Sequence, residues 1–121
     1  MTMTILTVDD SRTMRDMLNM TLSGAGFRVV QAEDGMHGLE VLQRETPQVI
    51  ITDINMPKLD GFGFIEGVRK TERYRATPIL VLTTESDAEK KMRARRAGAT
   101  GWIVKPFDAV KLVVVVRRVA A

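Results

Sequence analysis

The sequence contains no cysteine, and that absence excludes several classes of protein. A disulfide framework, a zinc site with cysteine ligands and catalysis by a thiol all need this residue. Such a chain suits the reducing cytoplasm, and we expect a cytoplasmic location. Apolar stretches long enough to cross a membrane are also missing, and no basic region precedes the first apolar segment. We therefore expect no association with a membrane.

What remains is the composition of a globular domain. The 121 residues are 45% hydrophobic, which is enough for one continuous core at a common domain size. The formal net charge is +3, with lysines and arginines in several segments and a cluster at 90–96. This charge permits nucleic-acid binding without requiring it, and we expect no nucleic acid among the partners. We expect one monomeric domain over residues 1–121.

Short apolar runs rich in β-branched residues predict five buried strands. They lie at 5–8, 29–30, 49–52, 79–82 and 102–104. The segments between them have the length of helices and carry apolar residues three or four positions apart. Ser11 and Asp34 are suited to cap the first two helices. The strands are continuous apolar runs, without alternating polar residues, and each is followed by a helix. This pattern predicts a doubly wound α/β fold, in which a parallel sheet has helices on both faces.

The last segment leaves its secondary structure open. Val113–Val116 is β-branched, which lowers helix propensity by about a few tenths of a kcal/mol per residue, so a final strand is an alternative. Asp108 offers an N-cap, and Arg117 and Arg118 would interact favourably with the C-terminal end of a helix dipole. We therefore predict a helix here.

Polar side chains follow four of the predicted strands. Asp9 and Asp10 follow the first strand, Asp53 the third, Thr83 the fourth and Lys105 the fifth. Ligands of open α/β sheets bind beyond these carboxyl ends. In the flavodoxin-like order 2-1-3-4-5, strands one and three are neighbours, so Asp9, Asp10 and Asp53 converge. That order is taken from known proteins of this fold class, because the residue pattern alone does not determine it.

Three neighbouring carboxylates repel one another and need a cation. Oxygen ligands without histidine or cysteine favour a hard ion, and few carboxylates with room for water suit Mg²⁺ better than Ca²⁺, with Mn²⁺ as a substitute. Lys105 can pair with a phosphate oxygen, and the Thr83 hydroxyl can donate to one. A carboxylate nucleophile can form an aspartyl-phosphate, and Asp53 is the predicted acceptor. A lone aspartate usually caps a turn, so the prediction of a phosphorylation site depends on the convergence of several polar side chains at one edge of the sheet.

Four segments closely resemble the response-regulator receiver family, in order and along essentially the whole chain. They are Val8-Asp9-Asp10-Ser11, the segment 53–61, Leu82-Thr83-Thr84 and Lys105-Pro106-Phe107. The separations of 30 residues from Asp53 to Thr83 and of 22 from Thr83 to Lys105 also fit the family. No segment is decisive alone, but the ordered set is specific.

The resemblance implies a response regulator of two-component signalling. A CheA-like histidine kinase would phosphorylate Asp53 in a Mg²⁺-dependent reaction. Asp10, Asp53 and the backbone carbonyl of Asn55 would hold the Mg²⁺. Asp9 would act mainly through the same metal site. The chain would not be an enzyme, beyond assisting its own phosphorylation and dephosphorylation.

The same resemblance assigns roles to the residues after the fourth and fifth strands. Thr83 and Lys105 would contact the phosphoryl group, and members often join the Lys105-Pro106 pair by a cis bond. We expect the modified Asp53 to draw in Thr83 and Lys105 and so to shift an equilibrium at the face formed by the fourth helix, fifth strand and fifth helix.

Within the family, the single-domain chemotaxis members are most similar. Thr13-Met14-Arg15 follows the acidic pair as in those members, and Asn55 and Glu85 each lie two residues beyond Asp53 and Thr83. We expect no output domain, and a function in chemotaxis through a flagellar-motor switch protein or a phosphatase. The alternative is a phosphate sink or an adaptor in another two-component pathway. Glu85 is alternatively a helix-start carboxylate.

Trp102 departs from the chemotaxis pattern, in which tyrosine usually stands three residues before the lysine. The indole is either packed on the fifth strand or part of a gate. The cations at 90–96 either form a solvated helix face or meet an acidic peptide. His37 is predicted to be a surface residue of the second helix, and the methionines are predicted to fill the core.

Overall fold

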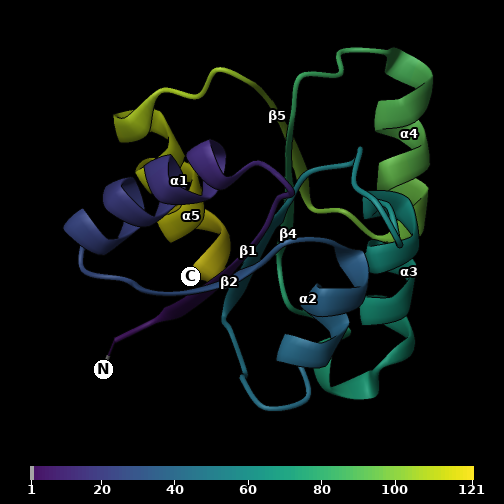
Figure 1. Cartoon of the computed structure of the whole chain (residues 1–121), viewed down its shortest axis with the longest axis horizontal. Coiled ribbons are helices and arrows are strands. Elements are labelled where there is room, and N and C mark those ends of the chain that lie inside the picture. The colour runs from purple at the N-terminus through teal and green to yellow at the C-terminus, as the bar shows by residue number, and fades with distance from the viewer. Residues whose placement is uncertain (1) are drawn as a thin grey trace.

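The computed structural model describes residues 2–121 as one five-stranded parallel sheet in the order β2-β1-β3-β4-β5 (Figure 1). The strands are β1 (Thr4–Val8), β2 (Arg28–Ala32), β3 (Val49–Thr52), β4 (Ile79–Thr83) and β5 (Gly101–Val104). The helices are α1 (Arg12–Gly24), α2 (Gly35–Val41), α3 (Gly61–Lys70), α4 (Ala88–Ala97) and α5 (Ala109–Ala120), with a 3-10 turn at Glu72–Tyr74. The predicted flavodoxin-like fold and strand order are confirmed.

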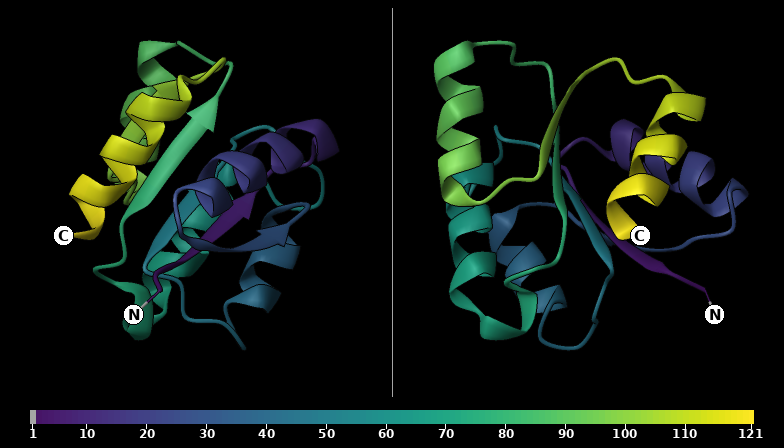
Figure 2. Two further views of the ribbon diagram at one scale, coloured as in Figure 1. Left: turned by 90° about the vertical axis from the view of Figure 1, so that its left-hand side faces the viewer. Right: turned by 180° about the vertical axis from the view of Figure 1, so that it is seen from behind.

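Helices cover both faces of the sheet. Figures 1 and 2 show α1 and α5 on one face and α2, α3 and α4 on the other. Successive side chains of each strand point to opposite faces, so Ile5 packs toward α1 and α5 while Leu6 packs toward α2 and α3. Burial on both faces explains why the strands read as continuous apolar runs. No described helix has the length and apolar character needed to span a membrane.

The last segment is a helix, as predicted. The Asp108 carboxylate accepts a hydrogen bond of 2.9 Å from the backbone N–H of Lys111 and caps α5. Leu112 and Val116, one turn apart, are buried in the core beneath α1 and α5, whereas Val114 is 48% exposed. Tertiary packing of one helix face thus outweighs the low intrinsic helix propensity of valine.

Aspartate and serine side chains cap the other helices as well. Ser11 accepts from the backbone N–H of Met14, and Asp34 accepts from that of His37, so both predicted N-caps are confirmed. Asp87 caps α4, which places Glu85 in the loop before the helix. Glu85 thus precedes the cap and lies outside the first turn of α4, although its carboxylate pairs with Lys90 of that helix, and the helix-start role considered for it stays a prediction.

The prediction that methionines fill the core is wrong. No methionine within residues 2–121 is fully buried, and those that touch the core are half-buried at its margin. Four others, Met17, Met20, Met36 and Met92, have exposed fractions near or above one half. The core consists mainly of isoleucine, leucine, valine and phenylalanine, whose rotamers are more restricted than those of methionine.

One buried polar group lacks a partner. The Thr7 hydroxyl on β1 is fully buried and has no hydrogen bond within the described residues. Thr7→Val keeps the side-chain shape, and we expect it to raise the free energy of unfolding by about 1 kcal/mol because no desolvated hydroxyl remains. Thr52→Val is the matched control: its buried hydroxyl donates to the Asp53 carbonyl at 2.8 Å, so this change should destabilise. Urea unfolding of both variants measures the difference, and equal effects would contradict it.

Candidate functional site

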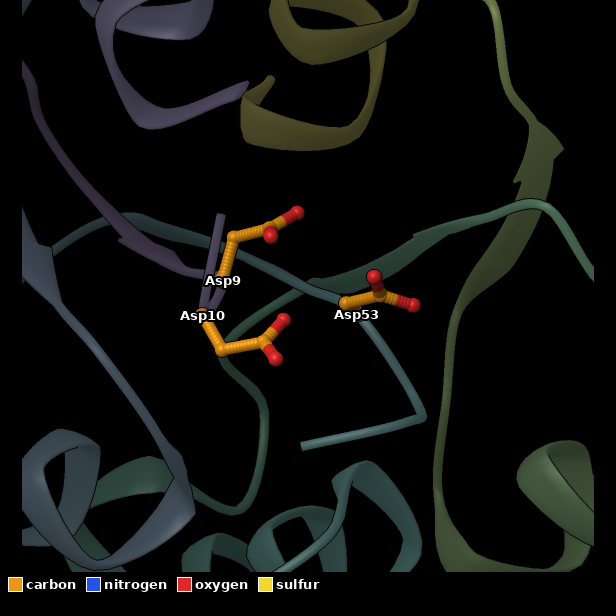
Figure 3. A group of neighbouring side chains, drawn as sticks. All are labelled: Asp9, Asp10 and Asp53. Carbon is orange, nitrogen blue, oxygen red and sulfur yellow. The ribbon is translucent and has the colours of Figure 1, made fainter. Parts of the chain in front are cut away.

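The three acidic side chains predicted to converge lie together at the carboxyl ends of β1 and β3. Val8 and Thr52 are register partners in the sheet, so the residues that follow them leave the sheet side by side. One carboxylate oxygen from each of Asp9, Asp10 and Asp53 lies within 4.8 Å of the others (Figure 3). Asp9 and Asp53 are buried, whereas Asp10 is exposed at the mouth of the site. The convergence predicted for these residues is seen in the structure.

Lys105 lies between two of these carboxylates. Its ammonium donates to Asp9 Oδ2 at 2.9 Å and to Asp53 Oδ2 at 2.8 Å, and only 9% of its side chain is exposed. Burial lowers the pKa of Lys105, but the hydrogen bonds and charges of Asp53 and Asp9 outweigh it and raise the pKa overall. Lys105 thus supplies a fixed positive charge at the point where the carboxylates meet.

Backbone groups fix the orientation of the two buried carboxylates. Asp53 Oδ1 accepts from the N–H of Ile54 at 2.6 Å, and Asp9 Oδ1 accepts from the N–H of Ser11 at 2.9 Å. The Lys105 N–H donates to the Thr83 carbonyl at 2.7 Å, which ties the end of β5 to the end of β4. The peptide bond from Lys105 to Pro106 is cis.

Burial raises the pKa of Asp9, with a further contribution from the charge of Asp53, although bonds from Lys105 and Ser11 oppose the shift. A raised pKa means that the folded state favours the protonated form, so this group's stabilising contribution is present below pH 3.8 and is lost as pH rises through the folded pKa. We expect Asp9→Asn to stabilise the metal-free protein at neutral pH, with the gain vanishing in acid. Thermal unfolding between pH 3 and pH 7 tests this, and a gain independent of pH would contradict the sign.

The oxygen donors suit a hard divalent cation. The cluster offers carboxylates without histidine or cysteine, and its exposed member leaves space for water or phosphate oxygens. This donor set fits Mg²⁺, as expected from the sequence. Asn55, whose backbone carbonyl was expected to be a further ligand, is exposed and two residues beyond Asp53.

A second set of contacts centres on Glu85, just after β4. Its N–H donates to Thr83 Oγ1 at 3.3 Å, and its carbonyl accepts from Trp102 Nε1 at 3.1 Å. Its carboxylate accepts from Asn55 Nδ2 at 3.2 Å and from Lys90 Nζ at 2.9 Å. The bonds from Lys90 and Asn55 lower the pKa of Glu85. Glu85 therefore connects the loop after β3, the end of β4, α4 and β5.

Two residues of the site meet the expectations only in part. Thr83 is fully buried, and its backbone carbonyl accepts from the Lys105 N–H, but its hydroxyl accepts from the N–H of Glu85 and forms no hydrogen bond with Asp53 or Lys105 within residues 2–121. Trp102 is half-buried and packs against the core, and its indole N–H donates to the Glu85 carbonyl, so packing on the fifth strand and gating both stay predictions.

Three further features support the site, and the roles that they have were not predicted from the residue pattern. Arg15 Nη1 donates to the Asp9 carbonyl at 2.7 Å, and Lys90 pairs with Glu85 across the start of α4. A Cβ at Gly61 would lie 2.3 Å from the Asp53 carbonyl oxygen. Each contact joins segments whose relative placement depends on the tertiary fold, although Gly61 stands inside the segment 53–61 that carries the family resemblance.

Comparison with known protein families identifies the chain. It belongs to the response regulator receiver domain family, whose model matches residues 5–117. It is therefore the receiver domain of a two-component response regulator. Receiver domains interact with histidine kinases and bind Mg²⁺ at an acidic site, which agrees with the carboxylate cluster described above.

Individual relatives differ in their described roles and in length. Chemotaxis protein CheY1 of Helicobacter pylori is 40% identical over 107 residues, which are 87% of this chain and 86% of that protein. The probable transcriptional regulator ycf27 of Porphyridium aerugineum is 37% identical over 115 residues, 95% of this chain and 47% of that protein. The chain thus spans about half the length of the second relative, and it spans 14% of the sensor histidine kinase CheAY of Helicobacter pylori.

Solved structures agree with the fold. The chemotaxis response regulator CheY4 of Vibrio cholerae superposes with a TM-score of 0.93 and 44% identity, covering 98% of this chain and 99% of that chain. The receiver domain of the sensor histidine kinase PA1611 from Pseudomonas aeruginosa has a TM-score of 0.92 and 26% identity, covering 99% and 98%. That structure has a magnesium ion coordinated in its active-site cleft.

Proposed function

We propose that this chain is a response regulator that a histidine kinase phosphorylates on Asp53 in a Mg²⁺-dependent reaction. The observation that carries the proposal is the position of the Asp53 carboxylate, 2.8 Å from the Lys105 ammonium and beside the carboxylates of Asp9 and Asp10. An acceptor carboxylate, a counter-charge and a cation site at one sheet edge are the parts that phosphoryl transfer to aspartate requires.

The chain's own residues would act as follows. Ile54 N–H and Lys105 hold the two oxygens of Asp53 in a fixed orientation, so that one oxygen can attack phosphorus in line while the phosphorus–nitrogen bond of a phosphohistidine breaks. Lys105 then pairs with a phosphoryl oxygen. Mg²⁺, held by Asp10, Asp53 and the Asn55 carbonyl, would neutralise charge on the transferring group.

The buried Thr83 hydroxyl would turn to the phosphoryl group as a donor. Its movement would release the N–H of Glu85, to which it is now bonded at 3.3 Å. Since Glu85 also holds Asn55 and Trp102, phosphorylation would reach the α4–β5–α5 face through this residue. Trp102, Glu85 and the Pro106 turn would thus modulate the switch.

The proposed output is a partner protein in chemotaxis, such as a flagellar-motor switch protein. Its support is the similarity to chemotaxis proteins over nearly their full length, since the chain covers 86% of CheY1 and 99% of the CheY4 structure. The ycf27 relatives, which are probable transcriptional regulators, support the alternative of another two-component pathway, in which this receiver would be a phosphate sink or an adaptor. Binding of the phosphorylated chain to a motor-switch peptide separates the two.

The first test is the intact mass after incubation with acetyl phosphate, with and without Mg²⁺, for the natural protein and for Asp53→Asn. We expect one phosphoryl adduct that requires Mg²⁺ and is lost in the variant. Asp10→Asn should retain Asp53 but form the adduct slowly, since a metal ligand is removed. An adduct that persists in Asp53→Asn would refute the assignment of the acceptor.

A further inference from the structure

The excess of positive charge lies on one side of the molecule. Residues 69–96 contain nine lysines and arginines against four acidic residues, whereas the rest of the chain contains nine against eleven. This segment includes the end of α3 and all of α4, which lie side by side on the same face of the sheet (Figures 1 and 2). The rest of the chain is slightly acidic, so the basic surface is local.

A groove runs between these two helices. One part is lined by Glu66, Arg69, Lys70, Arg93, Arg96 and Ala97. A second part, toward the start of α4, is lined by Asp87, Glu89, Lys90, Met92, Arg93 and Arg96, which belong to α4 or its N-cap and not to α3. Arg93 and Arg96 line both parts, and we call the whole the α3–α4 groove. It is separate from the hollow on the β5 side of α4, which Lys91, Arg95 and Trp102 line.

Several cations of the groove are available to a partner. Within residues 2–121, neither Lys70 nor Arg93 nor Arg96 forms an ion pair. The Arg93 guanidinium stacks over the Phe62 ring of α3, 4.0 Å from its centroid, which holds the group in place and leaves its N–H donors free. Arg69 differs, because its guanidinium donates to the carbonyls of Gly98 and of the 3-10 turn.

We propose that the α3–α4 groove docks an acidic segment of a partner protein. Guanidinium groups pair with carboxylates in a bidentate manner, and two of them line the groove without an ion-pair partner among the described residues. The acidic groups Glu66, Asp87 and Glu89 stand among the cations and would repel the continuous charge of a nucleic-acid backbone. A peptide with separated carboxylates fits this mixed pattern, and the residues that line the groove include no aromatic ring on which bases stack.

Lys90 connects this groove to the phosphorylation site. Its ammonium lines the groove and also pairs with Glu85, whose carboxylate holds Asn55. A partner carboxylate in the groove competes with Glu85 for Lys90 and so loosens Glu85. The competition for Lys90 does not depend on the proposed function. Its consequence, a changed lifetime of the phosphoryl group on Asp53, rests on that function.

Docking is tested without phosphorylation, by fluorescence anisotropy of a fluorescein-labelled peptide of about twelve residues that repeats Glu-Glu-Ala-Ala, about 18 Å long as a helix. We expect Arg96→Glu and Lys70→Glu each to weaken binding about tenfold, and Arg118→Glu, which changes the net charge equally on exposed α5, to weaken it less than about twofold. Equal losses in all three variants would mean attraction by net charge alone and would overturn the proposal. If an oligothymidylate bound more tightly than the peptide and lost affinity in the same variants, the groove would be assigned to nucleic acid instead.

The link through Lys90 has its own readout. Trp102 is the sole tryptophan and bonds to the Glu85 carbonyl, so its emission reports movement of that loop. We expect saturating peptide to change this emission in the natural protein and in Lys91→Gln, but not in Lys90→Gln. An unchanged response in Lys90→Gln would overturn the link. Because both measurements use unphosphorylated protein, their failure is distinguishable from a failure of Asp53 to accept a phosphoryl group.

Discussion

Replacing Lys105 by methionine is expected to destabilise the metal-free protein by about 3 kcal/mol at neutral pH. The ammonium is the cation that contacts both Asp9 and Asp53, and all three side chains are at most 11% exposed. Methionine fills similar space but leaves two buried carboxylates facing one another without compensation. Urea unfolding of the natural protein and the variant measures the loss.

Two conditions should restore the stability of Lys105→Met. The substitution removes the ammonium that opposes the raised pKa of Asp9, so acid protonates this carboxyl more readily and the deficit should shrink as pH falls. Mg²⁺ should raise the unfolding midpoint more in the variant than in the natural protein, because the ion replaces the lost positive charge. An ion present at a concentration of about 100 times its Kd contributes about 2.7 kcal/mol. Lys111→Met, on exposed α5, is the control and should change little. A deficit that neither acid nor Mg²⁺ reduces would show that packing, not charge, is responsible.

Gly61→Ala is expected to destabilise the fold by about 2–3 kcal/mol and to slow phosphorylation at Asp53. An added Cβ would lie 2.3 Å from the Asp53 carbonyl oxygen and 2.7 Å from Ile54 Cα. Both are backbone atoms, so the loop that orients the acceptor carboxylate must move. A displacement of about 1 Å at a reacting group can cost about 100-fold in rate.

The control for this substitution is Gly24→Ala at the end of α1. No atom lies within 4 Å of a Cβ added there, and alanine favours helix, so we expect a gain of up to about 1 kcal/mol. Thermal unfolding and the rate of adduct formation from acetyl phosphate are measured for both variants. A Gly61→Ala protein with natural stability and rate would show that the loop yields without cost.

The fold was predictable from residue patterns because each strand is buried on both faces. Runs such as Val49–Thr52 carry that burial directly, and the observed β3 has the same bounds. The ends of β2 were not predictable, since Arg28 and Gln31 at the sheet edge are polar and the apolar signal shrinks to Val29 and Val30. The order of the strands could not be predicted from the residue pattern either, and it was taken from known folds.

The carboxylate cluster was predictable for a topological reason. Parallel strands send their carboxyl ends to one edge, so Asp9, Asp10 and Asp53 meet wherever β1 and β3 are neighbours. This rule does not predict the contacts that long side chains of the helices make. Arg93 reaches Phe62 because α4 packs against α3, and Lys90 reaches Glu85 because of the conformation of the loop that leads into α4.

The placement of the methionines bears on how the protein withstands oxidants. Peroxide converts accessible thioethers to sulfoxides, which are polar and disrupt a core that contains them. Within residues 2–121 the most exposed methionine, Met20, is 77% exposed on α1, and the buried residues of both cores contain no sulfur. Oxidation should therefore act first on the outer faces of the helices, whereas the buried side chains of the sheet offer no thioether to modify.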